Sequence, residues 1–246
     1  MTIRVAVVGA EGRMGSQVCR AVEDAPDLAL VGRLDVGSDV GALAGRADVA
    51  VDFTVPGVTE SHVHTLLDAG VRAVVGTTGW SDDALARVGE HADQAGVPVL
   101  IAPNFAISAV LAMAFARRAA AWFDSAEVIE LHHPDKVDAP SGTAIHTARG
   151  IAAARREVGR GVMPDATVTA LEGARGAVVD GVHVHAVRLR GLVAHEEIVL
   201  GNPGEQLTIR TDSFDRVSFM PGVLLAIRHG QRYPGLTVGL EALLGL

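Results

Sequence analysis

The stretch Ile3 to Gly15, IRVAVVGAEGRMG, decides the fold that we expect for this chain of 246 residues. The apolar run Ile3–Val8 predicts a buried strand, and a segment of helical period follows it. Gly9, Gly12 and Gly15 stand between the two. This G-x-x-G-x-x-G spacing is a variant of the dinucleotide fingerprint, whose glycines let the backbone turn tightly against a pyrophosphate at a helix N-terminus. The alternative is a glycine-rich turn that only joins strand to helix.

An acid stands where a dinucleotide site needs one. Asp35 comes directly after the second predicted strand, Leu28–Leu34, where a carboxylate accepts hydrogen bonds from the adenosine ribose. Such an acid favours NADH over NADPH because it repels a 2′-phosphate. Arg13 and Arg33 are close enough in sequence to offset that repulsion, so use of both coenzymes stays open. In the alternative interpretation these three side chains are ordinary surface charges.

The first 105 residues alternate apolar runs with helix-period segments, which predicts a Rossmann-type α/β fold with a doubly wound parallel sheet. Further strands are expected at Val49–Phe53, Val71–Val75 and Val97–Ile101, and helices at Thr59–Ala69 and Asp82–Ala95, the latter capped by Ser81. Two strand ends lead into unusual loops, Gly76–Gly79 and Ala102–Phe105. In open α/β sheets such loops border the ligand crevice, so we expect both to contact the nicotinamide half, although simple turn chemistry explains either loop equally well.

A second, α+β domain is expected after residue 105. A long helix at Ile107–Trp122, a strand at Glu127–Leu131 and a helix at Thr143–Val158 precede a strand-rich region, Val168–Asp212, that we expect to form a mixed, largely antiparallel sheet. An apolar helix near Gly222–Arg228 and the final stretch Leu236–Leu246 are expected to pack on the first domain. The expected domains are therefore 1–105 with 214–246, which carries the dinucleotide signal, and a second domain at 106–213.

Composition excludes several classes of protein. The formal net charge of −8 argues against a nucleic-acid partner, since binding to phosphates depends on Lys and Arg. Aromatic residues make up 4% of the chain, so the core must consist mainly of Ala, Val and Leu. The sequence has no basic, apolar leader and no apolar run near the ~20 residues that cross a bilayer, so we expect no membrane partner and a cytoplasmic location.

Metal and thiol chemistry are not expected. His62 and His64 face different sides of a predicted helix, and His183 and His185 share one strand face without a third ligand. The single cysteine, Cys19, lies within the first helix and is interpreted as a packing residue.

The segment His132 to Thr143, HHPDKVDAPSGT, concentrates groups that bind anions and move protons. A histidine titrates near neutrality, and the Lys136 ammonium can donate a proton or hold a carboxylate. Ser141 can cap the helix that follows, whose first N–H groups, at Gly142 and Thr143, then face an anion. The alternative is a pair of half-buried histidines, a solvated lysine and a plain helix cap. The adjoining dinucleotide signal favours the chemical interpretation.

At these residues the chain resembles the dihydrodipicolinate reductases, also called 4-hydroxy-tetrahydrodipicolinate reductases, of bacterial lysine and diaminopimelate synthesis. The resemblance runs nearly end to end and looks most like the actinobacterial branch. Its motifs are VVGAEGRMG from Val7, VDFT from Val51, VVGTTG from Val74, IAPNFAI from Ile101, ELHHPDKVDAPSGTA from Glu130 and RLRGLVAHEE from Arg188.

The resemblance implies an enzyme that reduces a cyclic imine dicarboxylate with NADH or NADPH once its two domains close, and a homotetramer built through the substrate-domain sheet. It implies that His132 is the catalytic acid/base, Lys136 the proton donor, and His133, Gly142 and Thr143 substrate contacts. The coenzyme contacts that it implies are Gly9, Ala10, Glu11, Gly12, Arg13, Met14, Asp35, Gly76, Thr77, Thr78, Ala102, Pro103, Asn104 and Phe105.

Two positions depart from the family pattern. Glu11 stands where some relatives carry a small residue or Lys, which weakens the case for binding an extra phosphate, and Thr211 stands where a histidine is expected. Two rival functions remain at this point. One is a Rossmann dehydrogenase that acts on another imine or keto acid, and the other is a non-catalytic redox sensor that binds NAD(P)H.

Overall fold

The computed structural model describes residues 2–246, which divide into two compact units. The first unit runs to Ile107 and resumes at Arg216–Leu246, and the second is Ser108–Asp215. Each boundary lies two residues beyond the one expected from sequence. The chain therefore leaves the first unit and returns to it.

The first unit contains a six-stranded sheet in the order β11-β5-β4-β3-β1-β2, with every neighbouring pair parallel. Its strands are β1 (Ile3–Val8), β2 (Leu28–Leu34), β3 (Val49–Asp52), β4 (Arg72–Val75), β5 (Val99–Ile101) and β11 (Leu236–Val238). The strand order reverses between β1 and β3, which makes the carboxyl ends of these two strands the expected ligand crevice. The predicted Rossmann-type doubly wound sheet is confirmed.

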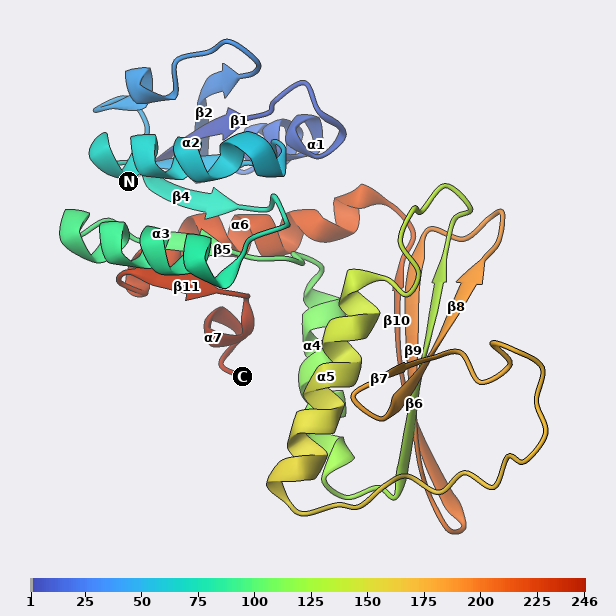
Figure 1. The fold of residues 1–246 in the computed structure, drawn as a ribbon. Helices are drawn as coiled ribbons and strands as arrows, with labels where there is room; N and C mark the ends of the chain where they lie inside the picture. Colours follow the sequence, from blue (N-terminus) through green and yellow to red (C-terminus); the bar gives the residue numbers. More distant parts are fainter. Residues whose placement is uncertain (1) are drawn as a thin grey trace. The chain divides into compact units, whose positions relative to one another are not determined.

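Helices cover both faces of this sheet: α2 and α3 lie on one side, α1 and α6 on the other (Figure 1). The helices are α1 (Arg13–Glu23), α2 (Pro56–Asp68), α3 (Asp82–Ala95), α6 (Met220–His229) and α7 (Glu241–Leu244), with short 3₁₀ helices at Val40–Leu43, Arg216–Phe219 and Gly230–Arg232. The predicted bounds of α3 are confirmed, since Ser81 Oγ accepts a 3.2 Å hydrogen bond from the Ala84 N–H.

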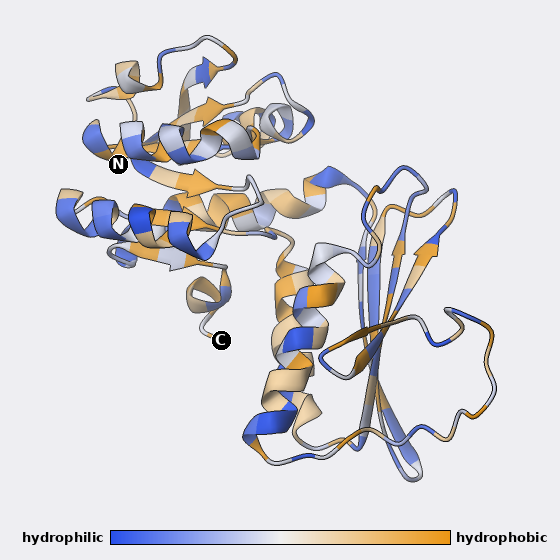
Figure 2. Cartoon of the chain, in the orientation of Figure 1, coloured by the Kyte–Doolittle hydropathy of each residue, from blue (hydrophilic) through white to orange (hydrophobic). Residues whose placement is uncertain are grey.

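The core of the first unit consists of small aliphatic side chains, as the composition predicts. Most residues of the inner strands β1, β3 and β4 are apolar and buried, because helices bury both faces of a parallel sheet. Strands β1 and β4 are largely orange in Figure 2. Side chains packed beneath α2 and α3 include Val8, Ala50, Val75, Val63, Leu66, Val88 and Ala92. Cys19 is 1% exposed and lies on the buried face of α1.

The second unit has a five-stranded sheet in the order β10-β9-β6-β8-β7. Its elements are α4 (Ile107–Ala120), β6 (Ser125–His132), α5 (Gly142–Glu157), β7 (Ala177–Val179), β8 (Val182–Arg188), β9 (Ala194–Asn202) and β10 (Glu205–Ser213). Only β6 and β8 pair in parallel, so the mixed, largely antiparallel sheet is confirmed. Residues 168–176 contain no strand, contrary to prediction, and the glycines at 173 and 176 adopt positive φ there.

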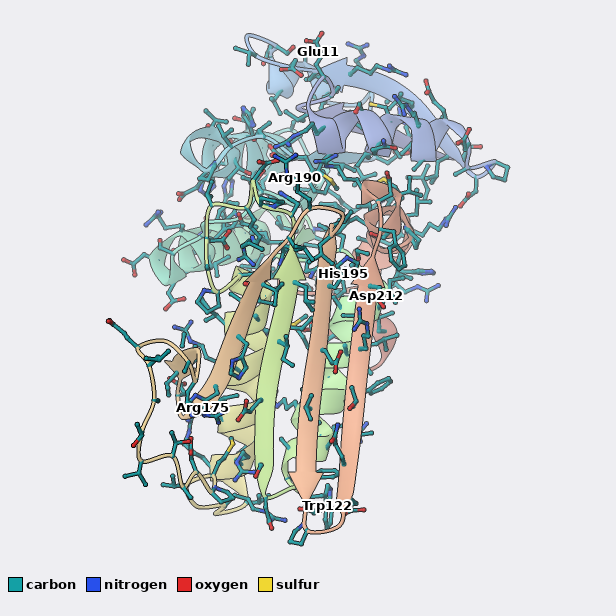
Figure 3. The ribbon with its side chains drawn as sticks, turned by 90° about the vertical axis from the view of Figure 1, so that its right-hand side faces the viewer. Glu11, Trp122, Arg175, Arg190, His195 and Asp212 are labelled. Carbon is teal, nitrogen blue, oxygen red and sulfur yellow. The ribbon has the colours of Figure 1, made fainter. Side chains whose placement is uncertain are left out.

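Both long helices of the second unit, α4 and α5, cover the same face of its sheet (Figure 1). Alternation along β6 buries Ala126, Val128 and Glu130 on that face, so one carboxylate stands in a row of core positions. Figure 3 looks onto the opposite face, where His195 and Asp212 form a 2.7 Å contact. No helix within residues 2–246 is long and apolar enough to cross a membrane.

Candidate functional site

In the turn after β1, backbone atoms approach each other too closely for a side chain at Gly9 or Gly15. Gly9 has φ +80°, and the N–H groups of Gly9 and Ala10 donate to the Leu34 carbonyl oxygen at 2.9 and 3.0 Å. A β-carbon at Gly15 would lie 2.0 Å from the Gly9 carbonyl oxygen. Gly12 begins α1 without a side-chain cap. The N-terminus of α1 therefore presents backbone N–H groups to an anion, as a pyrophosphate cradle requires.

Asp35 is fixed beside this turn. Its two carboxylate oxygens accept hydrogen bonds from the Glu11 N–H at 2.8 Å and the Val36 N–H at 2.9 Å, and these bonds hold the pKa of Asp35 below its usual value. Each oxygen keeps a lone pair for a ribose hydroxyl. Of the two arginines that were considered as counterions, Arg33 is paired with Glu23 at 2.6 Å.

Sequence reasoning missed Asp52, at the end of β3. Its carboxyl group is fully buried and accepts hydrogen bonds from the hydroxyls of Thr54, Thr59 and Thr77 at 2.7, 3.3 and 3.0 Å, while His62 Nδ1 lies 2.9 Å from its other oxygen. Asp52 thereby ties the loop after β3 to the loop after β4. An acid that ends an apolar strand run was the available signal, within VDFT.

The loops after β3, β4 and β5 meet around Phe53. A β-carbon at Gly76 would lie 2.0 Å from the Phe53 ring, so any other residue there would require the ring to move. The Phe53 ring centroid is 5.7 Å from that of Phe105. Thr77 is buried and Thr78 is exposed on the same loop. In the loop after β5, Ala102 and Phe105 are buried, Asn104 Oδ1 accepts from the Ala106 N–H at 2.9 Å, and Pro103 is exposed.

In the second unit, Glu130 organises the expected catalytic segment. Its carboxylate accepts hydrogen bonds from Arg188 Nη1 and Nη2 at 2.7 and 2.8 Å and from the Ser141 N–H at 2.9 Å, and His132 Nδ1 lies 2.6 Å from Oε2. Ser141 in turn caps α5, because its Oγ accepts from the Ala144 N–H at 3.2 Å. One buried carboxylate therefore joins the end of β6 to the start of α5.

The pKa shifts follow from these contacts. Burial raises the pKa of Glu130, but hydrogen bonds from Arg188, His132 and Ser141 outweigh it, and the pKa lies below its usual value. Burial lowers the pKa of His132 and Glu130 raises it, but the positive charges of Lys136 and Arg188 act with burial, and the pKa lies below its usual value. His132 is therefore mainly neutral at neutral pH. Because ionised Glu130 only accepts hydrogen bonds, Nδ1 carries the proton and Nε2 carries the lone pair.

Lys136 and the N-terminus of α5 already hold a carboxylate, that of Asp138. Lys136 Nζ donates to Asp138 Oδ1 at 2.6 Å, and the Gly142 N–H donates to Oδ2 at 3.3 Å. The ion pair with Lys136, with the Gly142 bond adding to it, holds the pKa of Asp138 below its usual value. Lys136, the expected proton donor, and Gly142, an expected substrate contact, thus converge on one anionic group.

The remaining predicted contacts lie on the same loop and helix. His133 is half-buried, its carbonyl oxygen accepts from the Lys136 N–H at 3.3 Å, and its Nδ1 has no protein partner within residues 2–246. The Thr143 carbonyl oxygen accepts from the Thr147 hydroxyl at 3.1 Å. The departure at Thr211 is accommodated in the core of the second unit, where its hydroxyl donates to Ser108 Oγ at 2.7 Å.

The histidine pairs that were considered as metal ligands have other partners. His64 Nδ1 is 2.7 Å from a ring nitrogen of His91, and His183 and His185 contact the Arg175 carbonyl oxygen and Glu127 at 2.6 and 2.7 Å. Over residues 2–246, no group of three or more His, Cys, Asp or Glu side chains is arranged to hold a metal ion.

A doubly wound sheet with this glycine turn, in a chain whose second unit carries His132, Lys136 and the start of α5 on one segment, fits a nicotinamide-dependent oxidoreductase. Family models for dihydrodipicolinate reductase match the chain almost throughout, the N-terminal model over residues 3–105 and the C-terminal model over residues 108–244. The chain therefore belongs to the dihydrodipicolinate reductase family, whose members are NAD(P)H-dependent enzymes of lysine and diaminopimelate synthesis.

Individual relatives are similar to this chain over their whole length. The chain is 71% identical to a 4-hydroxy-tetrahydrodipicolinate reductase of Beutenbergia cavernae, and 57% identical to one of Corynebacterium efficiens, with 100% of both chains covered in each case. Among solved structures, it is similar to a dipicolinate-bound dihydrodipicolinate reductase from Paenisporosarcina sp. TG-14, with a TM-score of 0.88 and 37% identity over 98% of this chain and 99% of that one.

Proposed function

We propose that this chain reduces dihydrodipicolinate, formed from 4-hydroxy-tetrahydrodipicolinate, to tetrahydrodipicolinate, and that its substrate carboxylate binds where Asp138 now lies. The observation that carries this proposal is the convergence of Lys136 Nζ and the Gly142 N–H on one carboxylate. A relative with 37% identity has dipicolinate bound, which is a cyclic dicarboxylate of the same class. A substrate carboxylate can exchange with Asp138 because the Asp138 side chain is 48% exposed.

The residues of the first unit fit a dinucleotide. The turn from Gly9 to Met14 would hold the pyrophosphate, Asp35 the adenosine ribose, and the loops Gly76–Thr78 and Ala102–Phe105 the nicotinamide half. The tight Gly9–Gly15 approach and the uncapped start of α1 support this fit. When bound, the reduced nicotinamide supplies the hydride. NADH and NADPH are both proposed as coenzymes.

Proton delivery is assigned to Lys136. Reduction of one unsaturated bond needs a hydride and a proton, and the Lys136 ammonium is a donor beside the bound carboxylate. Neutral His132 has its Nδ1–H on Glu130, so Nε2 acts as the acid/base atom that can accept a proton from, or return one to, the substrate side. His133 and Thr143 are proposed to orient the ring that carries the carboxylates.

We also propose that the protein is a cytoplasmic homotetramer, with copies of this chain packed on the helix-free face of the second sheet. Half-buried apolar residues lie on that face among charged ones: Ile129, Leu131, Val187 and Val199. The loop before β7 also exposes apolar side chains, since Val168 is 96% and Leu171 86% exposed in the single chain. Light scattering during chromatography should give four times the chain mass of 25.5 kDa, and a monomer would refute this part of the proposal.

The reaction itself is tested by generating the substrate in place. Pyruvate and aspartate semialdehyde are condensed by the preceding synthase, and loss of the reduced-nicotinamide absorbance is followed with NADH and NADPH separately. We expect oxidation of the coenzyme only when both precursors and the synthase are present. Coenzyme binding without its oxidation would favour a redox sensor instead, and oxidation with other imines or keto acids but not with this one would favour a different dehydrogenase.

A further inference from the structure

Two glutamates face each other inside the second unit. Glu130 on β6 and Glu196 on β9 are register partners in an antiparallel pair, and they are 0% and 4% exposed on the face that α4 and α5 cover. Residues opposite each other in such a pair have β-carbons about 5 Å apart, and like charges at that distance destabilise the pair. Two ionised carboxylates at these positions would repel strongly.

The partners of the two carboxyl groups differ sharply. Glu130 has Arg188, His132 and the Ser141 N–H around it. Within residues 2–246, Glu196 has one hydrogen-bond partner, the Thr147 hydroxyl at 3.1 Å from Oε2, and its buried Oε1 has none. No Lys, Arg or His of the described chain forms an ion pair with Glu196. A buried carboxylate without a cation costs much more free energy than the buried neutral acid.

The hydrogen bonds of Thr147 also favour a protonated Glu196. The Thr147 hydroxyl has a single proton, and two oxygens lie 3.1 Å from it, the Thr143 carbonyl and Glu196 Oε2. A carbonyl can only accept, so both contacts are satisfied when Thr147 donates to Thr143 and Glu196 donates to Thr147. Burial raises the pKa of Glu196 to about 7, with the Thr147 hydroxyl acting against burial and the charge of Glu130 adding to it.

Both glutamates reach the start of α5. Glu130 bonds to the Ser141 N–H that precedes the helix, and Glu196 connects through Thr147 to the Thr143 carbonyl in its first turn. We propose that Glu196 is a positioning residue that takes up a proton when a dicarboxylate binds at this helix start. Protonated Glu196 carries no charge, so Glu130 is then the only one of the two buried glutamates with a negative charge near the bound anion. This inference rests on the proposed function, which places the substrate carboxylate on Gly142 and Lys136.

The direction of the effect follows from electrostatics. Ionised Glu196 opposes an anion at the positive end of α5 and competes with the Thr143 carbonyl for the Thr147 proton. Binding of the anion must therefore favour the protonated form, and protonation must favour binding to the same extent. Ionised Glu196 repels the dicarboxylate through the partly buried interior of the unit. We expect this repulsion to weaken binding of the dicarboxylate by about five- to tenfold.

Other groups titrate or carry charge near Glu196 and must be separated from it. On the helix-covered side of the sheet they are Glu130 and His132 of β6 and Arg188 of β8. The register partner on β10 is the uncharged Thr211, and the facing residue of α5 is Thr147. His132 also gains proton affinity beside an anion, so a comparison of variants is needed rather than the wild type alone.

The test uses the full-length enzyme and dipicolinate as the probe. Calorimetry in two buffers of different ionisation enthalpy gives both the affinity and the protons taken up, between about pH 6 and pH 8.5. We expect Glu196→Gln to match the wild type at the acid end and to bind about five- to tenfold more tightly at the alkaline end, with less proton uptake. Glu157→Gln, which removes an exposed carboxylate from the other end of α5, should follow the wild type throughout.

Equal pH dependence of affinity and proton uptake in wild type and Glu196→Gln would overturn the inference. If Glu196→Gln does not fold, Glu196→Met removes the same titration with an apolar side chain of similar volume. In the wild type itself, the infrared C=O band of a protonated carboxyl should grow when dipicolinate is added above about pH 7, and no growth would also overturn it. Failure of the proposed function gives a different result, because dipicolinate would then not bind at any pH.

Discussion

His132 Nδ1 lies 2.6 Å from Glu130 Oε2, and the two residues are separated by one position on strand β6. Residues two apart on a strand share a face, so the contact is set by the strand itself and does not depend on a flexible loop. The buried carboxylate fixes which imidazole nitrogen carries the proton, and Nε2 is left for the substrate side. The contact thus links the sheet of the second unit to its proposed acid/base chemistry.

Replacing Glu130 by Gln should therefore impair catalysis more than coenzyme binding. An amide does not stabilise the Nδ1–H tautomer of His132 as a carboxylate does, and we expect kcat to fall by about 10²-fold. Arg188 loses its buried counterion, which costs about 3 kcal/mol of stability. Steady-state kinetics and thermal unfolding measure the two effects. NADH affinity, which depends on the first unit, is the internal control, and an unchanged kcat would contradict the role of Glu130.

Lys136→Ala tests the proton donor. Loss of a general acid typically lowers the rate by ~10²- to 10⁴-fold, so kcat should fall far more than NADH affinity changes. Dipicolinate binding should weaken as well, because Lys136 Nζ also holds the carboxylate position. Arg232→Ala, which removes a cation from a 3₁₀ helix of the first unit, serves as the matched charge control. Turnover near the wild-type rate in Lys136→Ala would show that another group delivers the proton.

Asp138→Asn should have the opposite effect on binding. Asp138 occupies Lys136 Nζ and the Gly142 N–H in the ligand-free chain, so a substrate carboxylate must displace it. An amide binds both groups more weakly, and the affinity for dipicolinate should rise by about threefold to tenfold. Titration calorimetry measures the change. If dipicolinate bound Asp138→Asn no more tightly than wild type, then Asp138 would not share the carboxylate position with the substrate.

The sequence predicted the fold well because its main signals are local. The strand Ile3–Val8, the glycine turn and the helix Asp82–Ala95 depend on neighbours in the chain, and all three are confirmed. The strand-rich region was expected to begin at Val168 from alternation that starts only at Val182, and residues 168–176 form a loop that its glycines permit.

The candidate site was predictable only in part. Motif positions such as His132 and Gly142 could be named, but the residues that hold them could not. Glu130 and Glu196 are 66 positions apart, and only the register of β6 against β9 brings them face to face. The Thr77 hydroxyl, 25 positions from Asp52, likewise reaches the Asp52 carboxyl group only because β3 pairs with β4. Long-range pairing of this kind leaves no periodic trace in a single sequence.

Coenzyme preference should depend on Asp35. Its oxygens are held by two backbone N–H groups at the place expected for the adenosine ribose. Asp35→Asn should raise the KM for NADH by roughly tenfold and leave the KM for NADPH unchanged or lower, because the charge that repels a 2′-phosphate is gone. Adding Glu23→Gln frees Arg33 and should improve NADPH use further. Equal changes in both KM values would mean that Asp35 does not contact the ribose.

Glu196 also predicts how stability depends on pH. Its folded-state pKa of about 7 exceeds the unfolded value, so the folded state binds more protons between the two values. The stabilisation from its proton is therefore complete below the unfolded pKa and is lost as pH rises through about 7. Glu196→Gln does not titrate, so its free energy of unfolding should gain about 3 kcal/mol relative to wild type between about pH 4.5 and pH 7.5. Urea unfolding of both proteins across this range measures the difference, and Glu157→Gln should show none. If the free energies of unfolding of wild type and Glu196→Gln differed by the same amount at every pH in this range, Glu196 would be ionised throughout the range.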